Sequence, residues 1–308
     1  MLASPIMQAL GRGITTISFR HRTTLEVWYR DLSLDELPSE PVTVAVDGDS
    51  DRFVRFEAVQ TRIDLDAPPN GAADAYLRLH LLSARLVRPR ELNVDGIFGQ
   101  LPLVAWTDLG AVHPADLDEL RARRRLAGKS LIVHGIDKFP RMTDFVSPPG
   151  VRIADASRVR LGAHLAEGTV VMHEGFVNFN AGTLGPSMVE GRITAGSLVD
   201  ADSDLGAGSS ILGSLSGGGS HMVSIGKRCL LGANAGTGIS LGDDSAVEAG
   251  LYITGGTLVT LPDGNVVKAV ELSGTPGILF RRHSVHGNVE AVPWKSSTFA
   301  GLNPELHE

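Results

Sequence analysis

The sequence predicts a mainly β protein built around a parallel β-helix of hexapeptide repeats, with an N-terminal α/β domain and a short C-terminal extension. Two observations support this fold class. Glycine is concentrated in one segment, because 21 of the 36 glycines fall within the 112 residues from Val151 to Pro262. Backbone without a Cβ suits tight turns, which such a coil needs at every corner. Aliphatic residues also recur at every sixth position across the same segment.

The six-residue repeat runs in two phases, which slip once between Val189 and Ile193. Neither an α-helix, with 3.6 residues per turn, nor an alternating strand, with a period of two, produces this spacing. In a parallel β-helix each hexapeptide forms one side of a triangular coil, and its aliphatic residue points inward. The alternative is a β-sandwich with chance spacing, which does not account for apolar or small residues at 17 of 19 positions. These positions are Ile153, Val159, Leu165, Val171, Val177, Thr183 and Val189, then Ile193, Val199, Leu205, Ile211, Gly217, Val223, Cys229, Ala235, Leu241, Val247, Ile253 and Val259.

Coils of short hexapeptide repeats are typically left-handed, although the six-residue period itself does not show the handedness of the coil. We therefore expect a left-handed parallel β-helix over residues 149–262, with residues 1–148 and 263–308 covering its ends. Trimers are common for such helices because three flat faces pack around one axis. Cys229 falls on the repeat and is expected to be a small core residue and not a nucleophile.

The first 148 residues predict a mixed α/β domain. β-Branched and aromatic residues predict strands at 13–20 and 24–30, and residues 101–108 predict another. Apolar residues at helical spacing predict a helix over 72–87. A second helix is expected over 114–128, because acidic residues precede basic ones along it. We expect the basic run at 121–125 to be a solvated helix end, with ligand binding as the alternative.

Composition argues against several classes of protein. A net charge of -7 and a pI near 5.8 do not favour broad attraction to nucleic acid or to anionic membranes. The N-terminus lacks a basic segment followed by an apolar one, so no signal peptide is expected, and no long apolar run predicts a membrane span. The single cysteine, Cys229, excludes an intrachain disulfide and suits a cytoplasmic location.

Residues 172–192, MHEGFVNFNAGTLGPSMVEGR, interrupt the plain repeat. They place Glu174, Glu190 and Arg192 in a region with few other charges, and the phase slip follows directly. A second interruption, from Gly213 to His221, is expected to form a loop outside the coil. Departures from a local rule are typical of functional sites, so we expect the chemistry here.

Five strings closely resemble the tetrahydrodipicolinate N-succinyltransferase family of the actinobacterial type: HEGFVNFNAGTLG, SMVEGR, LSGGG, GKRCLLGANAG and VEAGLY. The resemblance is strong over residues 150–285 and weaker, though compatible, before them. It implies a homotrimer that acts in lysine and diaminopimelate biosynthesis. Succinyl-CoA and an amino dicarboxylate would meet in a cleft between subunits, where the amine attacks the thioester and coenzyme A leaves.

The resemblance places the family's catalytic glutamate, in the MVEGR motif, at Glu190. The attacking amine must lose a proton, and a carboxylate accepts it readily only where burial raises its pKa from about 4.3 towards neutrality. Alternatively, Glu190 attacks the thioester first and forms a mixed anhydride. The sequence leaves both routes open. The structural alternative is that Glu190 forms an ion pair with Arg192.

The resemblance also assigns binding residues. It implies that Arg192 holds the succinyl carboxylate and that the backbone N–H of Gly213 holds the thioester oxyanion. The alternatives are a surface arginine and a turn glycine. The acyl-CoA groove would contain Ala207, which replaces a family glycine and narrows the channel, and Ser210, Ala233, Glu248, Ala249 and Gly256. The polar end of the coenzyme would meet Lys268, Arg281, Arg282, His283 and Ser284, and the arginines beside Phe280 suit phosphate binding and adenine packing.

Some relatives bind a divalent ion, such as Mg²⁺, on the trimer axis through an aspartate and a glutamate. Glu174 matches the glutamate, but the aspartate position falls on Ser157, so the match is incomplete. Three symmetry-related Glu174 carboxylates would repel one another without an ion or protons. A zinc site of histidines is the alternative. His164 and His173 lie nine residues apart without a clear third partner, and His221 in the expected loop could contact substrate.

Two other functions fit the same pattern. A related acyl-CoA transferase, such as a sugar or serine acetyltransferase, would use acetyl-CoA in place of succinyl-CoA. A β-helix scaffold without catalysis would keep its function when Glu190 is replaced. The sequence does not identify the residues that bind the acceptor amine.

Overall fold

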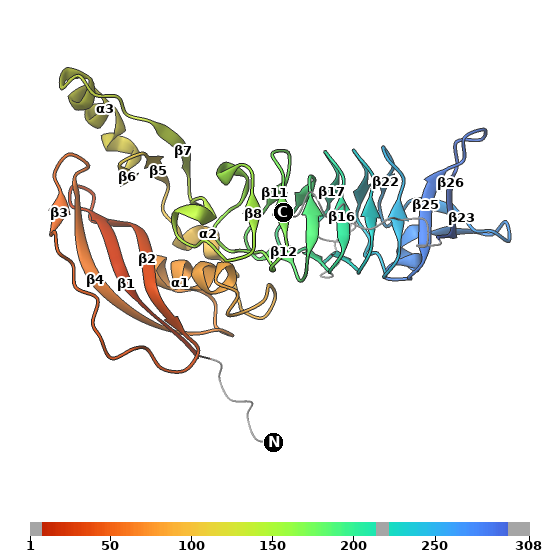
Figure 1. Cartoon of the computed structure of the whole chain (residues 1–308), viewed down its shortest axis with the longest axis horizontal. Coiled ribbons are helices and arrows are strands. Elements are labelled where there is room, and N and C mark those ends of the chain that lie inside the picture. The colour runs from red at the N-terminus through yellow and green to blue at the C-terminus, as the bar shows by residue number, and fades with distance from the viewer. Residues whose placement is uncertain (1–7, 214–221, 295–308) are drawn as a thin grey trace. The chain divides into compact units, whose positions relative to one another are not determined.

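The computed structural model describes residues 8–213 and 222–294, so His221 and Gly217 lie outside the described residues. The chain divides into two compact units, Met1–Val146 and Ser147–Glu308 (Figure 1). The predicted three-part division, with boundaries after residues 148 and 262, stays a prediction.

The N-terminal unit is a mixed α/β structure. Its larger antiparallel sheet has the strand order β2-β1-β4-β3. Helix α1 (Gly71–Ser83) packs on this sheet, and the hydroxyl of Tyr76 donates to the carbonyl of Leu25 at 3.1 Å. A smaller antiparallel sheet has the order β6-β5-β7. The bounds are β1 (Gln8–Ser18), β2 (Thr23–Ser33), β3 (Gly48–Asp49), β4 (Val54–Asp64), α2 (Ile97–Gln100), β5 (Val104–Thr107), β6 (Gly110–Val112), β7 (Val133–Asp137) and the 3-10 turn η2 (Met142–Asp144).

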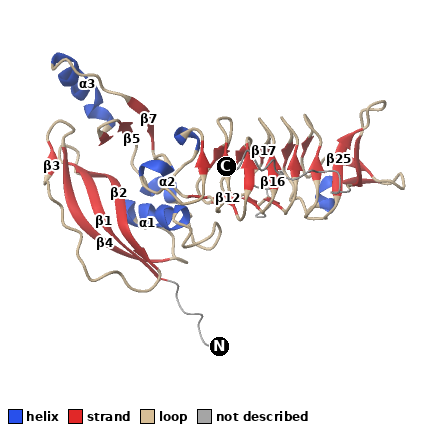
Figure 2. Cartoon of the chain, viewed as in Figure 1, coloured by secondary structure: helices blue, strands red, loops and turns tan. Residues whose placement is uncertain are grey.

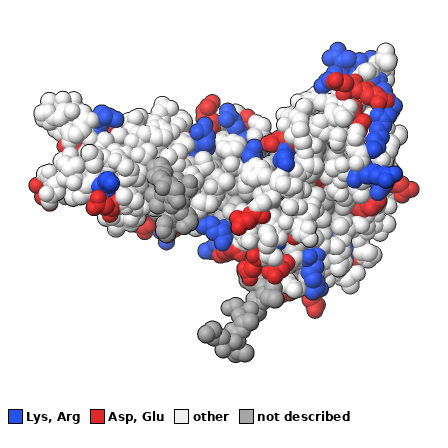
Figure 3. All heavy atoms as spheres, turned by 180° about the vertical axis from the view of Figure 1, so that it is seen from behind, with Lys and Arg blue, Asp and Glu red and all other residues white. Residues whose placement is uncertain are grey.

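The predicted helix over 114–128 is divided into a 3-10 turn, η1 (Pro114–Asp116), and helix α3 (Leu117–Leu126). Its basic end is solvated, as expected. Arg123 pairs with Glu119 at 2.5 Å, and Arg121 pairs with Asp118. Figure 3 shows positive and negative side chains next to one another at this end of the N-terminal unit. The run therefore forms local ion pairs, and no uniformly basic surface results.

The C-terminal unit is a parallel β-helix, which confirms the predicted fold class; the left-handed sense stays a prediction. Short strands alternate with turns along the whole unit (Figure 2). They form three parallel ladders, which we call faces 1, 2 and 3. The chain passes from face 1 to face 2 to face 3 in every coil.

The bounds of the coil elements follow. Face 1 contains β8 (Arg152–Ile153), β10 (Val170–Val171), β13 (Ser187–Val189), β16 (Ser203–Leu205), β19 (Leu230–Leu231) and β21 (Ala246–Val247). Face 2 contains β11 (Phe176–Val177), β14 (Arg192–Ile193), β17 (Ser210–Ile211), β20 (Gly236–Thr237) and β22 (Tyr252–Ile253). Face 3 contains β9 (Ala163–His164), β12 (Ala181–Thr183), β15 (Leu198–Val199) and β18 (Ser224–Ile225), and the 3-10 turn η3 (Ala156–Arg158) precedes β9.

The aliphatic repeat forms the core of this unit. On face 1, Val171 pairs with Val189, Val189 with Leu205, and Leu231 with Val247, and each of these side chains is buried. Full burial of each aliphatic side chain contributes about 1.5–3 kcal/mol, so the stack is the main source of stability of the coil. The coils also approach closely: a Cβ on Gly182 would lie 1.8 Å from the carbonyl oxygen of His164.

The predicted phase is wrong between residues 223 and 235. The ladder residues after the interruption are Ile225, Leu231 and Thr237, which pair with Val199, Leu205 and Ile211. The predicted positions, Val223, Cys229 and Ala235, precede them by two residues and are buried as well. Each side of the coil has two inward positions, and the first of them holds small residues. The sequence alone did not distinguish the two positions, because both are apolar here.

Cys229 is a core residue, as expected. It stands at the small inward position, next to Ser203, whose hydroxyl accepts from the Cys229 N–H at 3.0 Å. Its Sγ lies 3.2 Å from the carbonyl oxygen of Gly242. Burial raises the pKa of the Cys229 thiol to about 11.

The C-terminal segment closes the last coil. Strand β25 (Ile278–Arg282) continues face 1 by pairing in parallel with β21, and β26 (Val289–Pro293) pairs with β25 in antiparallel. Strands β23 (Leu258–Thr260) and β24 (Val266–Lys268) and the 3-10 turn η4 (Ala269–Leu272) complete this end. None of the helices in the described ranges is long and apolar enough to cross a membrane.

The buried thiol gives a prediction for labelling with a thiol reagent. At pH 8 a thiol with a pKa near 11 is only about 0.1% thiolate, whereas an unfolded cysteine with a pKa near 8.5 is about a quarter ionised. Native protein should therefore react far more slowly with Ellman's reagent than protein in denaturant, which should yield one thiol per chain. Because the unfolded thiol ionises first, its contribution to stability should fall as the pH rises from about 8.5 towards 11. Rapid labelling of the native protein at pH 8 would contradict the buried position.

Candidate functional site

The edge between faces 1 and 2 brings together most of the predicted site residues. Each coil turns this corner directly after its face 1 ladder residue. Glu190 follows Val189, and its N–H donates to the carbonyl of Leu205 at 2.9 Å. Glu248 follows Val247, and its N–H donates to the carbonyl of Phe280 at 2.9 Å. Ala207, Ala233, Ala249, Arg281 and Arg282 occupy the same edge in the other coils.

The spacing along this edge follows from the ladder. Adjacent strands lie about 4.8 Å apart, so the four steps from Glu190 to Arg281 span about 19 Å. Glycine and alanine occupy the middle of the edge, while charged residues occupy its two ends. The edge is therefore a long, narrow surface with a carboxylate near one end and two arginines at the other.

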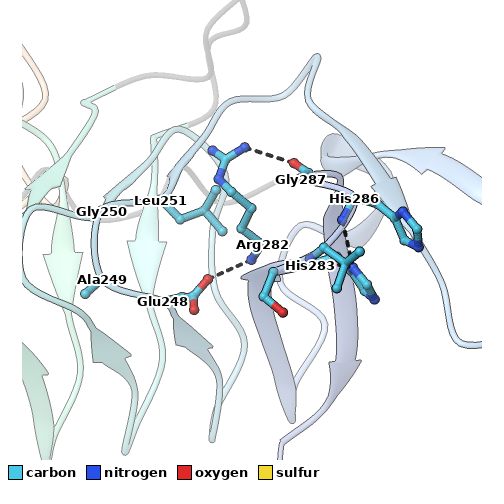
Figure 4. Close-up of a pocket in the computed structure, with 10 residues that line it drawn as sticks. Glu248, Ala249, Gly250, Leu251, Arg282, His283, His286 and Gly287 are labelled. Carbon is cyan, nitrogen blue, oxygen red and sulfur yellow. Dashed lines mark hydrogen bonds between the residues drawn. The ribbon is translucent and has the colours of Figure 1, made fainter.

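The arginine end contains a pocket of about 480 Å³ (Figure 4). Glu248 Oε2 accepts from the backbone N–H of Arg282 at 2.7 Å, which fixes the turn after β25. Arg282 Nη1 donates to the carbonyl of Gly287 at 3.0 Å. Figure 4 shows that these two contacts connect Arg282 to Glu248 and to Gly287, which also line the pocket. Predicted residues that line the pocket are Glu248, Ala249, Arg282, His283 and Ser284.

Two details of this pocket differ from the sequence analysis. Phe280, which stands beside the arginines in the sequence, is 1% exposed and points into the core opposite Val247, so it is not part of the pocket surface. His286, which was not predicted, stacks on His283 with ring centroids 4.7 Å apart. The signal available in the sequence was the spacing of the two histidines in HSVHG.

A second pocket, of about 340 Å³, lies beside Glu190. Its lining residues are Arg158, Glu174, Phe176, Gly191, Arg192, Gly208 and Ser209. Arg192 extends from face 2, and its Nη1 donates to the Ser210 hydroxyl at 3.4 Å. Arg158, which the sequence analysis missed, brings a second guanidinium to this pocket. Its closest ion pair, with Asp155, is long at 4.0 Å.

Glu190 is half-buried and does not itself line the second pocket, but its neighbours in the chain, Gly191 and Arg192, do. Within the described residues its carboxylate makes neither a hydrogen bond nor an ion pair. The structural alternative, an ion pair with Arg192, is therefore not formed.

Gly213 and Gly256 lie on the other edge of face 2, where the chain turns towards face 3. A Cβ on Gly213 would approach the carbonyl oxygen of Ala195 at 2.9 Å, so close packing explains this glycine. The path from Glu190 to Ala195, the residue beneath Gly213, covers five residues of extended chain, or roughly 15 Å. One chain therefore does not bring Glu190 and Gly213 together. Lys268 lies on the exposed hairpin strand β24, away from both pockets.

The expected metal ligands do not assemble within the described residues of one chain. Ser157 donates through its hydroxyl to Asp155 Oδ1 at 2.7 Å, and this contact is the main cause of the lowered pKa of Asp155. Glu174 lies in the second pocket with Arg158 and Arg192. His164 is buried on face 3, while His173 is exposed in the turn that follows face 1. Among the described residues neither histidine belongs to a group of three metal-ligating side chains.

Known proteins resemble this chain over most of its length. A family model described as "Tetrahydrodipicolinate N-succinyltransferase middle" matches residues 101–141, and one described as "Hexapeptide repeat of succinyl-transferase" matches residues 222–255. The 2,3,4,5-tetrahydropyridine-2,6-dicarboxylate N-succinyltransferase of Pseudomonas aeruginosa is 58% identical over 254 residues, which cover 81% of this chain and 73% of that protein. The Pseudomonas putida enzyme of the same name is 55% identical over the same shares.

A solved structure agrees in fold. It is a Campylobacter jejuni protein described as a 2,3,4,5-tetrahydropyridine-2-carboxylate N-succinyltransferase, with a TM-score of 0.80, 30% identity and 92% of each chain covered. The two enzymes of known sequence named in the preceding paragraph come from Pseudomonas species, so they give no support to the actinobacterial subtype.

Proposed function

The chain belongs to the 2,3,4,5-tetrahydropyridine-2,6-dicarboxylate N-succinyltransferase family, and on that premise we propose how its residues carry out the reaction. The protein transfers the succinyl group of succinyl-CoA to the amine of tetrahydrodipicolinate in lysine biosynthesis. The observation that supports the assignment of residues is their alignment along the edge between faces 1 and 2, which runs from Glu190 to Arg282.

Succinyl-CoA lies along this edge with its nucleotide at the arginine end. Arg281 and Arg282 bind the phosphate groups, because guanidinium groups suit phosphate oxygens. The small residues Ala207, Ala233 and Ala249 let the pantetheine arm approach the coils. The stacked rings of His283 and His286 offer the adenine a flat surface beside the arginines. Ser210 accompanies the arm on face 2, and Ser284 lies with the arginines. Gly256, on the other edge of face 2, meets the arm from a neighbouring protomer, as Gly213 does.

The thioester then reaches Glu190, about 19 Å from Arg281. The amine nitrogen attacks the thioester carbon, the C–N bond forms, and the C–S bond breaks to release coenzyme A. In the simpler route Glu190 accepts the proton that the amine loses. In the other route Glu190 attacks first, and the amine displaces it from a mixed anhydride. Arg192, in the adjoining pocket, binds the succinyl carboxylate.

The oxyanion donor comes from a second copy of the chain. Glu190 and Gly213 lie on opposite edges of face 2, so the N–H of Gly213 reaches the thioester only from a neighbouring protomer. A homotrimer with three flat faces provides such pairs of edges at each interface. The trimer explains why a single chain leaves Glu190 without a partner.

Arg158 is a candidate for the acceptor. Tetrahydrodipicolinate carries two carboxylates, and the pocket beside Glu190 holds two guanidinium groups, those of Arg158 and Arg192. If Arg192 takes the succinyl carboxylate, Arg158 remains for a carboxylate of the acceptor. The axial divalent ion is not part of this proposal, because Ser157 is tied to Asp155 and does not complete a site with Glu174. A cytoplasmic location agrees with the single buried cysteine.

Replacing Glu190 tests the catalytic assignment. We expect Glu190→Gln to lower kcat for coenzyme A release by about 10²–10⁴-fold, because a positioned proton acceptor contributes that much. The affinity for succinyl-CoA, measured by calorimetry, should change little. Glu167→Gln, at an exposed glutamate of the same unit, is the matched control and should keep full activity.

Two results would contradict this assignment, and two further measurements test the donor and the route. Full turnover by Glu190→Gln would remove Glu190 from the chemistry, and collapse of the assembly in that variant would make it structural. Faster coenzyme A release with acetyl-CoA than with succinyl-CoA would reject the succinyl pocket. Release of one coenzyme A per site before the amine is added would favour the anhydride route over direct proton transfer.

Steady-state kinetics should distinguish the role of Arg158 from that of Arg192. Arg158→Ala should raise KM for the acceptor by about tenfold or more while KM for succinyl-CoA is retained, and Arg192→Ala should do the reverse. Arg152→Ala, at an exposed arginine of β8, serves as the control. If Arg158→Ala left both KM values unchanged, Arg158 would have no part in binding.

A further inference from the structure

The N-terminal unit contains a group of metal-ligating side chains that the transfer reaction does not use. One ligand atom from each of His21, His113 and Asp116 lies within 4.8 Å of the others. His21 stands in the turn between β1 and β2, His113 precedes η1, and Asp116 ends η1. Segments far apart in the sequence thus bring two imidazoles and a carboxylate to one point.

Asp116 is the least expected member. It occupies the N-cap position of α3, where an aspartate usually accepts a hydrogen bond from the first turn of the helix. Its side chain makes no such bond. Instead it is 6% exposed, and its Oδ2 is buried without a hydrogen bond in the described structure, although His21 Nε2 lies 3.2 Å away. A buried carboxylate oxygen without a donor is costly unless something else binds it.

The other oxygen of Asp116 is held in place. Arg20 Nη1 lies 3.2 Å from Asp116 Oδ1 and 2.6 Å from Glu119 Oε2. The Arg20 guanidinium also lies over the Phe53 ring at 3.5 Å. Such supporting contacts orient the carboxylates that bind metals. The charge of Arg20 is offset by Glu119, so Oδ2 keeps its negative character towards the histidines.

The two histidine rings stack with centroids 3.7 Å apart. Nitrogen ligands bind zinc at about 2.0–2.1 Å, so the rings must splay from this stack to share one ion. His21 can turn, because its side chain is 32% exposed and its ring is held only by the stack on His113 and the contact with Asp116 in the described structure. His113 Nδ1 accepts from the Ala115 N–H at a long 3.3 Å, a weak contact that the ring can give up on binding. Water can occupy the remaining coordination position on the exposed side.

We propose that His21, His113 and Asp116 form a binding site for a divalent transition-metal ion of the zinc type. Two imidazole nitrogens and one carboxylate oxygen suit Zn²⁺, Co²⁺ or Ni²⁺ and not Mg²⁺, which prefers oxygen ligands. The site joins the β1–β2 turn to the start of α3. Its three residues belong to the N-terminal unit, whereas Glu174 and Glu190 belong to the C-terminal unit.

Cobalt titration tests this site directly. The full chain, without a histidine tag and treated with EDTA, is titrated with Co²⁺ while the visible absorption of bound cobalt is recorded, and Zn²⁺ is then added as a competitor. We expect one Co²⁺ per chain, displacement by Zn²⁺, no competition by Mg²⁺, and a higher Tm with Zn²⁺.

Three variants locate the ion. His21→Ala and Asp116→Asn should each weaken Co²⁺ binding by about tenfold or more, and His21, being partly exposed, should be replaceable without loss of folding. His286→Ala is the matched control, because it removes one ring from the only other histidine stack recorded among the described residues. It should leave Co²⁺ affinity unchanged. The proposal fails if the wild-type chain does not bind Co²⁺, if His21→Ala binds it as tightly as the wild type, or if His286→Ala alone abolishes binding.

Discussion

The inward stacking of one aliphatic residue on the next, in parallel register, is the constraint on which the rest of the C-terminal unit depends. Val189, Leu205 and Leu231 are each buried and lie one strand spacing apart. Because the register is fixed, the residue that follows each of them always falls on the same edge. The core thereby aligns side chains that are 16 to 33 residues apart in the sequence, such as Glu248 and Arg281, on one surface.

The different roles of the ladder positions and the corner positions explain the composition of the edge. The ladder positions must be apolar, whereas the corner positions only have to permit a turn, so they can vary with function. Alanine and glycine in the middle leave room for an extended ligand, and Glu190 and Arg282 give the two ends opposite chemistry. The surface suits an acyl-CoA, which has a reactive thioester at one end and phosphates at the other.

The sequence predicted the coil because a period of six has no other simple structural origin, and it predicted Glu190 and Arg282 through family motifs. It misplaced the phase at Val223, because the interruption from Gly213 to His221 breaks the count of six after Ile211. The two inward positions that follow, Val223 and Ile225, are both apolar, so the sequence does not show which one belongs to the ladder. The core position of Phe280 was not predicted, because it lies beyond the last repeat position, Val259, and a single residue gives no periodicity to show that it belongs to the ladder. Arg158 was missed because its partner in the pocket, Arg192, is two coils later in the chain, and only the folded coil brings them together.

The central claim is that the active site forms between two copies of the chain, and mixed assemblies test it most directly. Glu190→Gln chains and Gly213→Pro chains, which lack the backbone N–H at position 213, are first shown to be folded and inactive separately. They are then unfolded together and refolded as a mixture. If each site takes Glu190 from one protomer and Gly213 from its neighbour, random mixing in a trimer leaves about a quarter of the sites intact. The account predicts recovery of about a quarter of the wild-type activity. Mixed assemblies that remain inactive would show that one chain holds the whole site.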